Sequence, residues 1–344
     1  NFFTVSLVFL SISFILGFFE EIKFFNDYNV KIYYPIVLTF LNTPSILLEL
    51  FPFIFLISTK FFFIYLYDRN EIEILKNNGI NYLKILSILT LLSLIIGIII
   101  ILFYYTLSSN LKSNYLNFKN KFSNNNEYLA VVNDSGLWIK EEIDENINII
   151  HAEKFKDNMI EKITITTVGK SYDPTITIVA KNGNIENKIW ILNDVKIVNN
   201  ESSVEKFSQY KHKSTFNGEI ISNLFSNLNS LNIYQLNQLS KNYSKIGYSN
   251  TDVKVHLNKL YSMPIFFILM TIIGFLIMIK FKFIVSKFFI IVVGVFVSVI
   301  VYYINYFSSL FGANETIPVN LSVWLPHLIL FLFCSIGMVR INEI

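Results

Sequence analysis

Cysteine and charge are both scarce in this chain. It has one cysteine, Cys334, and charged residues make up 15% of its 344 residues, with a net charge of +3. A single cysteine excludes an intrachain disulfide framework, and so small a net charge argues against a nucleic-acid partner. Hydrophobic residues make up 53% of the chain, which is too apolar for an ordinary soluble domain. The composition therefore indicates a polytopic membrane protein.

Motifs for catalysis and metal binding are also lacking. The four histidines are scattered without the spacing of metal ligands, at His151, His212, His256 and His327. The chain has no HExxH or nucleophile motif. The string VGKS at 168–171 resembles the end of a P-loop, but that motif needs a glycine where this chain has Thr164. We therefore expect a protein without catalytic residues, a metal site or a bound cofactor.

Six apolar segments are long enough to cross a bilayer. A helix needs roughly 20 mostly apolar residues to span the hydrocarbon core. The segments cover about 1–19, 44–67, 83–106, 261–280, 283–307 and 320–339. The first is too long for the core of a signal peptide and has no small-residue cleavage site, so we expect it to be retained as a span.

A long insert of different chemistry, about 107–255, separates the third apolar segment from the fourth. Polar and apolar residues alternate in KITITTV (162–168), TITIVAK (175–181) and NINIIHAEKF (146–155), with turn signals between these runs. A period of two predicts a β-rich domain, either a sandwich or an open roll, and helical spacing returns over 222–260. The expected fold class is membrane α + β, with transmembrane helices arranged 3+3 around the β domain.

Basic residues in the short loops set the expected orientation. One set of loops and the C-terminal end carry Arg69, Lys76, Lys84, Lys280, Lys282, Lys287 and Arg340. The opposite loops, 20–43 and 308–319, carry only Lys23 and Lys31. Because cytoplasmic loops are enriched in Lys and Arg, we expect both termini in the cytoplasm and the β domain on the other side.

A short charged segment, Asp68 to Gly79, joins the second and third apolar segments. Asn70 followed by Glu73 matches the capping-box pattern that begins a helix, and Gly79 suits the left-handed residue that ends one. The segment therefore predicts a short helix. Two roles remain open for it: an amphipathic helix lying at the membrane surface, or a coupling helix that docks on a cytoplasmic motor.

The segment FPFIFLISTKFFFIYLYDRNEIEILKNNG (51–79) resembles the second span and following loop of the lipopolysaccharide export permeases, the LptF/LptG family. The matching residues are Phe51, Pro52, Arg69, Asn70, Glu71, Ile72 and Gly79. SGLWIK (135–140) resembles the segment that opens the outer β domain in the LptG branch. Proline-containing motifs match the fourth and sixth spans, at Pro264, Pro318 and Pro326. The resemblance covers nearly the whole chain.

This resemblance implies a subunit of the inner membrane that extracts lipopolysaccharide and passes it to a periplasmic bridge. It implies pairing with LptF, contact with LptC, and ATP hydrolysis with Mg²⁺ in a separate LptB dimer. The implied domains are 1–106 with a coupling helix at about 69–78, a periplasmic jelly-roll-like domain at 107–255, and 256–344. The residues implied to couple to LptB are Arg69, Glu71, Ile72, Leu75 and Gly79.

Lipopolysaccharide combines acyl chains with anionic phosphates, so its site needs an apolar wall and basic residues at the outer membrane surface. The candidates are Lys23, Phe18, Phe19, Phe25, Tyr303 and Phe307. Lys23 matches one of several basic positions in LptG proteins, although it also fits an ordinary solvated lysine, and each aromatic residue also fits lipid-facing packing. Lys60 departs from the Gly- and Ala-rich second span of the family, and we expect it to snorkel to the cytoplasmic surface.

Two other functions stay open at this point. One is the paralogous LptF subunit. The other is a membrane-anchored periplasmic binding or scaffold protein, in which the β domain does the work and the loops are passive. Binding of an ATPase to the segment Asp68 to Gly79 would separate a transport subunit from such a scaffold.

Overall fold

The computed structural model describes most of the chain, and the chain divides into two compact units. The described residues are 1–26, 30–122, 137–143, 146–156, 158–168, 174–199, 203–218, 220–221, 227–246, 249–281 and 286–342. The helical unit comprises Asn1–Tyr115, Asn229–Ile233 and Thr251–Ile344. The sheet unit comprises Leu116–Leu228 and Tyr234–Asn250.

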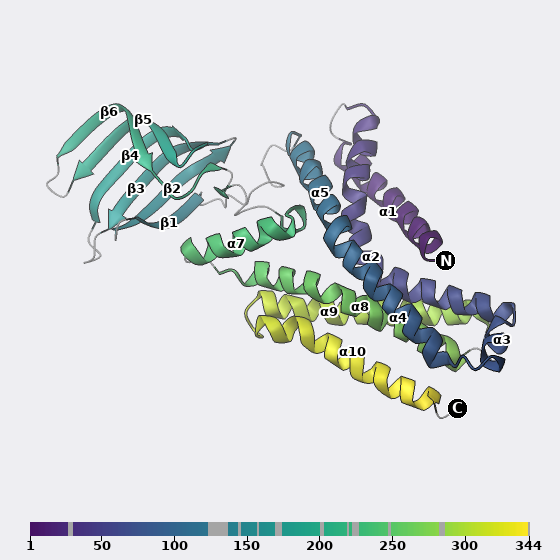
Figure 1. The fold of residues 1–344 in the computed structure, drawn as a ribbon. Helices are drawn as coiled ribbons and strands as arrows, with labels where there is room; N and C mark the ends of the chain where they lie inside the picture. The colour runs from purple at the N-terminus through teal and green to yellow at the C-terminus, as the bar shows by residue number, and fades with distance from the viewer. Residues whose placement is uncertain are drawn as a thin grey trace. The chain divides into compact units, whose positions relative to one another are not determined.

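Among the described residues, six helices are long and apolar enough to cross a membrane, which confirms the predicted spans (Figure 1). They are α1 (Phe2–Phe24), α2 (Tyr33–Asp68), α4 (Tyr82–Ile99) with its continuation, α8 (Thr251–Phe281), α9 (Lys287–Ala313) and α10 (Val319–Asn342). The third continues through a π-helical turn, η1 (Ile100–Tyr104), into α5 (Tyr105–Asn120). The helices are longer than the predicted apolar segments. An apolar segment covers only the residues that cross the hydrocarbon core, whereas helical hydrogen bonding continues into the polar residues beyond it.

The helix α8 is central to the helical unit, where it packs against α2, α4, α9 and α10. Small and hydroxyl residues bring these helices close together. A Cβ atom at Gly274 of α8 would lie 2.7 Å from the Leu56 carbonyl oxygen of α2. Ser93 of α4 and Thr271 of α8 share a hydrogen bond of 2.8 Å. Close packing and hydrogen bonds of this kind drive helix association in lipid, where the hydrophobic effect between helices is absent.

The sheet unit contains a six-stranded antiparallel sheet in the order β1-β2-β3-β4-β5-β6. Its strands are β1 (Leu137–Ile143), β2 (Asn146–Lys156), β3 (Met159–Val168), β4 (Pro174–Asn184), β5 (Ile189–Asn199) and β6 (Val204–Lys213). The three alternating runs of the sequence form β2, β3 and β4, which confirms the predicted β-rich domain between the third and fourth spans. The described strands form one sheet, which agrees with the open-roll alternative.

Alternation of side chains gives the sheet one buried face, as expected for a strand period of two. The buried residues on it include Leu137, Ile139, Ile150, Ala152, Ile163, Ile165, Ile178, Ala180, Trp190 and Leu192. The sheet unit also contains most of α7 (Ile233–Ile246). Two sequence motifs are incomplete in the structure, because Ser135 and Gly136 of SGLWIK and residues 169–171 of VGKS lie outside the described residues.

Candidate functional site

The charged segment between α2 and α4 forms the short helix α3 (Glu71–Asn77), where the sequence predicts one. Its first residue is preceded by Asn70, which has a φ of 55° and makes no side-chain capping hydrogen bond. The predicted capping box is therefore wrong. An N-cap residue normally takes an extended conformation, whereas the Asn70 N–H donates to the Tyr67 carbonyl at 3.0 Å and so closes the end of α2. Asparagine fits this position because it tolerates the left-handed conformation.

Gly79 ends α3 as predicted, with a φ of +78°. The Gly79 N–H donates to the Lys76 carbonyl at 2.9 Å, and the Ile80 N–H donates to the Leu75 carbonyl at 2.9 Å. These two bonds form a Schellman motif, which satisfies the last carbonyl groups of a helix. The direction in which the chain enters α4 therefore depends on a left-handed residue at position 79.

We expect Gly79→Ala to weaken this turn by about 1 kcal/mol, since a Cβ atom disfavours the left-handed conformation. Hydrogen exchange at the Ile80 amide should accelerate about fivefold, which corresponds to that energy. Gly79→Asn is the matched control, because asparagine accepts this conformation and should recover much of the protection. Equal exchange in the wild type and Gly79→Ala would show that the turn is held by other contacts.

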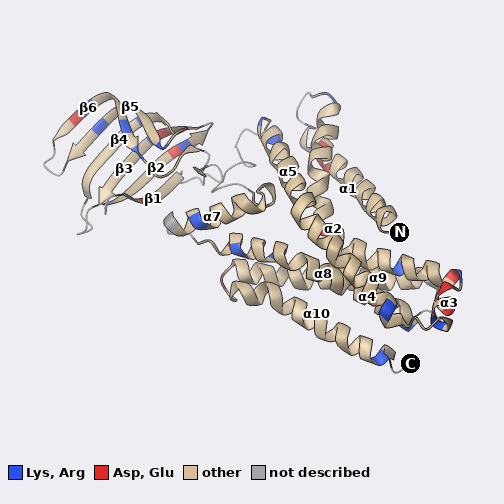
Figure 2. Cartoon of the chain, in the orientation of Figure 1, with Lys and Arg blue, Asp and Glu red and all other residues tan. Residues whose placement is uncertain are grey.

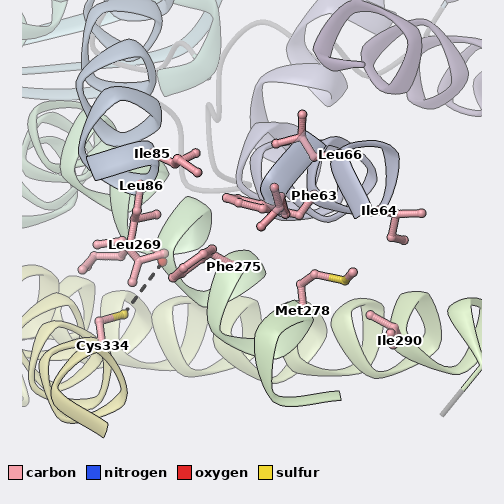
Figure 3. Packing of buried hydrophobic residues seen from close by; sticks show 12 residues of the cluster. Phe63, Ile64, Leu66, Ile85, Leu86, Leu269, Phe275, Met278, Ile290 and Cys334 are labelled. Atoms are coloured by element: carbon pink, nitrogen blue, oxygen red, sulfur yellow. Dashed lines mark hydrogen bonds between the residues drawn. The ribbon is translucent and has the colours of Figure 1, made fainter. Parts of the chain in front are cut away.

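Ile72 fixes α3 to the helical unit. It is 1% exposed and belongs to a buried cluster at one end of the bundle, together with Phe63 of α2, Leu86 of α4 and Phe275 of α8 (Figure 3). Leu75 is partly buried and packs at the edge of the same cluster. These contacts join α3 to α2, α4 and α8, and close-packed protein interiors resist compression.

The outward side of α3 is charged and carries one large apolar residue (Figure 2). Glu73 and Lys76 are exposed, and Glu71 is half-buried. Ile74 is 57% exposed, unlike Ile72 two residues before it. This combination of acidic side chains beside an exposed isoleucine provides both a charged and an apolar contact for a partner.

Basic residues at both ends of α3 lie over aromatic rings. The Arg69 guanidinium is 4.4 Å from the centre of the Tyr65 ring, and the Lys76 ammonium is 4.2 Å from the centre of the Tyr82 ring. The hydroxyl groups of Tyr67 and Tyr82 are hydrogen-bonded at 2.9 Å, which joins α2 directly to α4. Cation–π contacts at exposed sites are modest in energy. Together with this hydrogen bond they orient α2 and α4 on either side of α3.

The residues proposed for substrate contact do not all reach the surface. Lys23, Phe19, Tyr303 and Phe307 are exposed and Phe18 is half-buried, whereas Phe25 is buried within the chain. The Tyr303 and Phe307 rings stack with their centres 6.1 Å apart on α9. Both α1 and α9 pack against α2. Phe25, which follows the last residue of α1, therefore packs within the chain.

The family model described as lipopolysaccharide export system permease LptF/LptG matches residues 1–340 of the chain. The chain belongs to this family. No curated protein sequence matches the chain significantly. Its six candidate spans agree with a multi-pass inner-membrane permease, and membership indicates a transport subunit of a lipopolysaccharide export complex with partner subunits.

This permease buries the charged residue Lys60 of α2, of which 1% is exposed. Its Nζ donates to the Ile290 carbonyl of α9, and the Ile291 carbonyl lies at 3.5 Å. Gly294 leaves room for the lysine, because a Cβ atom at that position would overlap the Lys60 side chain. The snorkelling prediction is therefore wrong. Carbonyl groups near the beginning of α9 accept the hydrogen bonds of Lys60 within the helical unit.

The sequence analysis did not single out Ile74 as the exposed apolar residue of α3. The signal for it was present, since Ile72 and Leu75 share one face of a helix at a spacing of three, and Ile74 falls off that face. By contrast, no sequence pattern indicated that the charged residues Lys60 and Glu141 would be buried. Their surroundings are built by segments distant in sequence.

Proposed function

We propose that this chain is the LptG-type permease subunit of an ATP-driven lipopolysaccharide transporter. In this proposal it pairs with LptF, receives motion from a cytoplasmic LptB dimer, and passes lipopolysaccharide toward LptC and the periplasmic bridge. ATP and Mg²⁺ bind in LptB, and this chain supplies no catalytic residue. The observation that carries the proposal is α3, whose exposed side suits a partner while Ile72 anchors its other side in the bundle.

The geometry of α3 supports a division of roles among the residues proposed to couple to LptB. Glu71 and Ile74 contact the ATPase: Ile74 is the exposed apolar residue of α3, and Glu71 is the half-buried acidic residue that matches the family pattern, beside the exposed Glu73. Ile72 and Leu75 act within the chain and transmit the displacement to α8 and α2. Arg69 and Gly79 set the angle of α3 through the Tyr65 contact and the left-handed turn.

The exposed side chains near the ends of α1 and α9 support a substrate contact in this proposal. Lys23 offers a cation for a lipid phosphate, and Phe19, Tyr303 and Phe307 offer an apolar surface for acyl chains. The segment around Trp138 favours the LptG branch over LptF, because its Gly-Leu-Trp sequence resembles that branch.

Co-purification with LptB and LptF tests the coupling role. We expect Glu71→Arg and Ile74→Asp to lower LptB binding or stimulated ATPase activity by about tenfold or more, equivalent to ~1.4 kcal/mol. Glu186→Arg, an exposed acidic position in the sheet unit, is the matched control and should leave both unchanged. If LptB binds all variants equally, α3 is a passive surface helix, and a periplasmic scaffold becomes the better account.

A further inference from the structure

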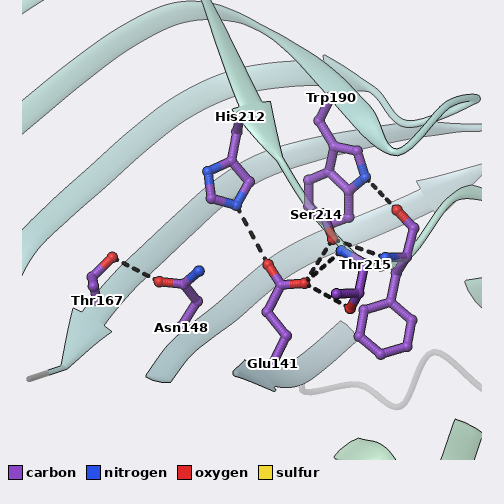
Figure 4. Close-up of polar contacts among 8 residues, drawn as sticks. Glu141, Asn148, Thr167, Trp190, His212, Ser214 and Thr215 are labelled. Carbon is purple, nitrogen blue, oxygen red and sulfur yellow. Dashed lines mark hydrogen bonds and ion pairs between the residues drawn. The ribbon is translucent and has the colours of Figure 1, made fainter. Parts of the chain in front are cut away.

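Two carboxylates are buried in the described part of the chain, Glu141 of the sheet unit and Glu21 of the helical unit. Glu141 of β1 accepts hydrogen bonds from Ser214 and Thr215 (Figure 4). Its Oε1 also lies 3.5 Å from Nε2 of His212 on β6. Because β1 and β6 are the two edges of the sheet, these contacts stabilise the sheet unit itself. Glu21 needs a separate account, because it lies near the end of the candidate span α1.

Side chains of three helices are joined in a series that begins at Glu21. This residue is 2% exposed and accepts a hydrogen bond of 2.8 Å from the Tyr115 hydroxyl of α5. The Lys112 ammonium lies 4.6 Å from the centre of the Tyr115 ring. Lys112 also donates to the side-chain carbonyl of Asn42 on α2 at 2.6 Å. These contacts link α1 to α5 and α5 to α2.

The helix α1 packs along α2 by a narrow stripe of residues. The buried residues of α1 are Val5, Ser13, Gly17 and Glu21. The last three recur at a spacing of four, which places them on one face of the helix. A Cβ atom at Gly17 would lie 3.3 Å from Cγ2 of Thr39 on α2. Serine and glycine allow this close approach, but they have few side-chain atoms to interlock with α2. Glu21 is the member of the stripe with a long side chain, and its bond to α5 fixes the rotation of α1 about its axis.

The side of α1 opposite Glu21 carries two candidate substrate contacts. Lys23 follows Glu21 by two residues, which corresponds to about 200° around a helix. Phe19 precedes Lys23 by four residues, so these two side chains lie on the same side of α1. Lys23 is exposed, and Phe19 is 63% exposed. The direction in which both side chains point therefore depends on how Glu21 is held.

We propose that Glu21 is a positioning residue for capture of the lipid substrate. Its bond to Tyr115 fixes the rotation of α1. Held in this way, α1 presents Lys23 to a lipid phosphate and Phe19 to an acyl chain. The inference rests on the proposed function for these two lipid contacts. Glu21 itself is buried on the other side of α1 and does not contact the lipid. A carboxylate suits this task because hydrogen bonds to an ionised group are stronger than those between neutral groups.

The sign of the charge separates positioning from direct electrostatics. A negative charge at Glu21 repels a phosphate, so its removal alone should strengthen binding of an anionic lipid. Positioning predicts weaker binding for any change that breaks the bond between α1 and α5. Tyr115→Phe is the sharpest such change, because it removes the hydroxyl group that donates to Glu21 and leaves every charge in place.

Hydrogen exchange on the full chain in lipid nanodiscs tests whether this bond holds α1. The Phe25 N–H donates to the Glu21 carbonyl at 3.0 Å and so reports on the last turn of the helix. We expect it to exchange about fivefold faster in Tyr115→Phe and in Glu21→Ala. Glu21→Gln should remain close to the wild type, because its amide oxygen can still accept from Tyr115. Unchanged exchange in Tyr115→Phe overturns the inference.

Tyr105→Phe is the matched control. Tyr105 is also a buried tyrosine of α5, and its hydroxyl group donates to the Leu231 carbonyl at 2.8 Å. Its replacement removes the same group from the same helix without touching Glu21. We expect Phe25 exchange and lipid binding to stay at the wild-type level in this variant. Equal effects of Tyr105→Phe and Tyr115→Phe would reflect a general loosening of α5 and would overturn the inference.

Binding of purified lipid A to the chain, co-purified with its partner subunits, tests the capture role. Lipid A should bind about tenfold more weakly to Tyr115→Phe and Glu21→Ala, and Glu21→Gln should recover most of the affinity. In a Lys23→Ala background, Tyr115→Phe should weaken binding less than it does alone, since the contact that it misaligns is already absent.

The outcomes distinguish this inference from the proposed function. Unchanged lipid A affinity in Tyr115→Phe, together with weaker binding in Lys23→Ala, overturns the positioning role and leaves the proposed function intact. Failure of the wild type to bind lipid A, or full affinity in Lys23→Ala, overturns the lipid contact of the proposed function together with this inference.

Discussion

Replacement of Ile72 by aspartate should disrupt the helical unit, whereas the same replacement at Ile74 should not. Ile72 is 1% exposed and Ile74 is 57% exposed, although both lie on the seven-residue helix α3. A carboxylate at position 72 would be buried among the apolar side chains of Phe63, Leu86 and Phe275. An uncompensated buried charge costs about 3–5 kcal/mol, so we expect a large fall in the thermal midpoint of the purified protein.

Thermal unfolding and size-exclusion profiles of the two variants make this comparison directly. The Ile74→Asp protein should unfold near the wild-type temperature and remain monodisperse, since its new charge lies in solvent. Similar midpoints for both variants would mean that Ile72 is not enclosed as described. The same two variants separate folding from partner binding. Loss of LptB binding in Ile72→Asp would follow from disruption of the helical unit, whereas loss of LptB binding in Ile74→Asp would identify α3 as the docking surface.

The second large effect is expected at the crossing of α2 and α8. In Gly274→Ala the new Cβ atom would lie 2.7 Å from the Leu56 carbonyl oxygen, and a backbone atom cannot rotate away as a side chain does. The two helices must separate, so we expect a loss of about 1–3 kcal/mol, the range found for overpacked cores. Because α8 also contacts α4, α9 and α10, the change should lower the midpoint of the whole helical unit.

Gly17→Ala of α1 is the matched control for this substitution. A Cβ atom at Gly17 would lie 3.3 Å from Cγ2 of Thr39, a side-chain methyl group that can move slightly. We expect a much smaller change in the unfolding temperature. Equal changes in unfolding temperature for the two substitutions would show that α2 and α8 are not packed more closely at Gly274 than α1 and α2 are at Gly17.

Composition and period predicted the architecture because those signals are local. An apolar run identifies a span wherever it packs, and a period of two identifies a strand before its partner is known. Gly79 was predictable for the same reason, since its left-handed conformation belongs to a single residue. The wrong prediction at Asn70 was also local, because one residue can cap the next helix or end the previous one, and sequence pattern does not decide between them.

The environments of Lys60 and Glu141 were not predictable because they are built by distant segments. Lys60 donates to the carbonyl of Ile290 on α9, and the two residues are 230 positions apart in the sequence. Glu141 meets Ser214 through the curvature of the sheet. A buried polar residue requires a partner, but the sequence carries no mark of which partner it will have. The difference in exposure between Ile72 and Ile74 is instead local, because Ile74 lies off the helix face that Ile72 shares with Leu75.

The strand order and the central position of α8 have a consequence for synthesis of the protein. Each strand of the sheet pairs with its neighbour in sequence, so every hairpin can form soon after it is made. The buried faces of α2 and α4 instead need α8, which begins at Thr251. A nascent chain therefore completes its sheet while Phe63 and Leu86 still lack Phe275 as a neighbour. During that interval, lipid or the insertion machinery must cover the faces that later form the bundle, and this is when the chain is most vulnerable to misassembly.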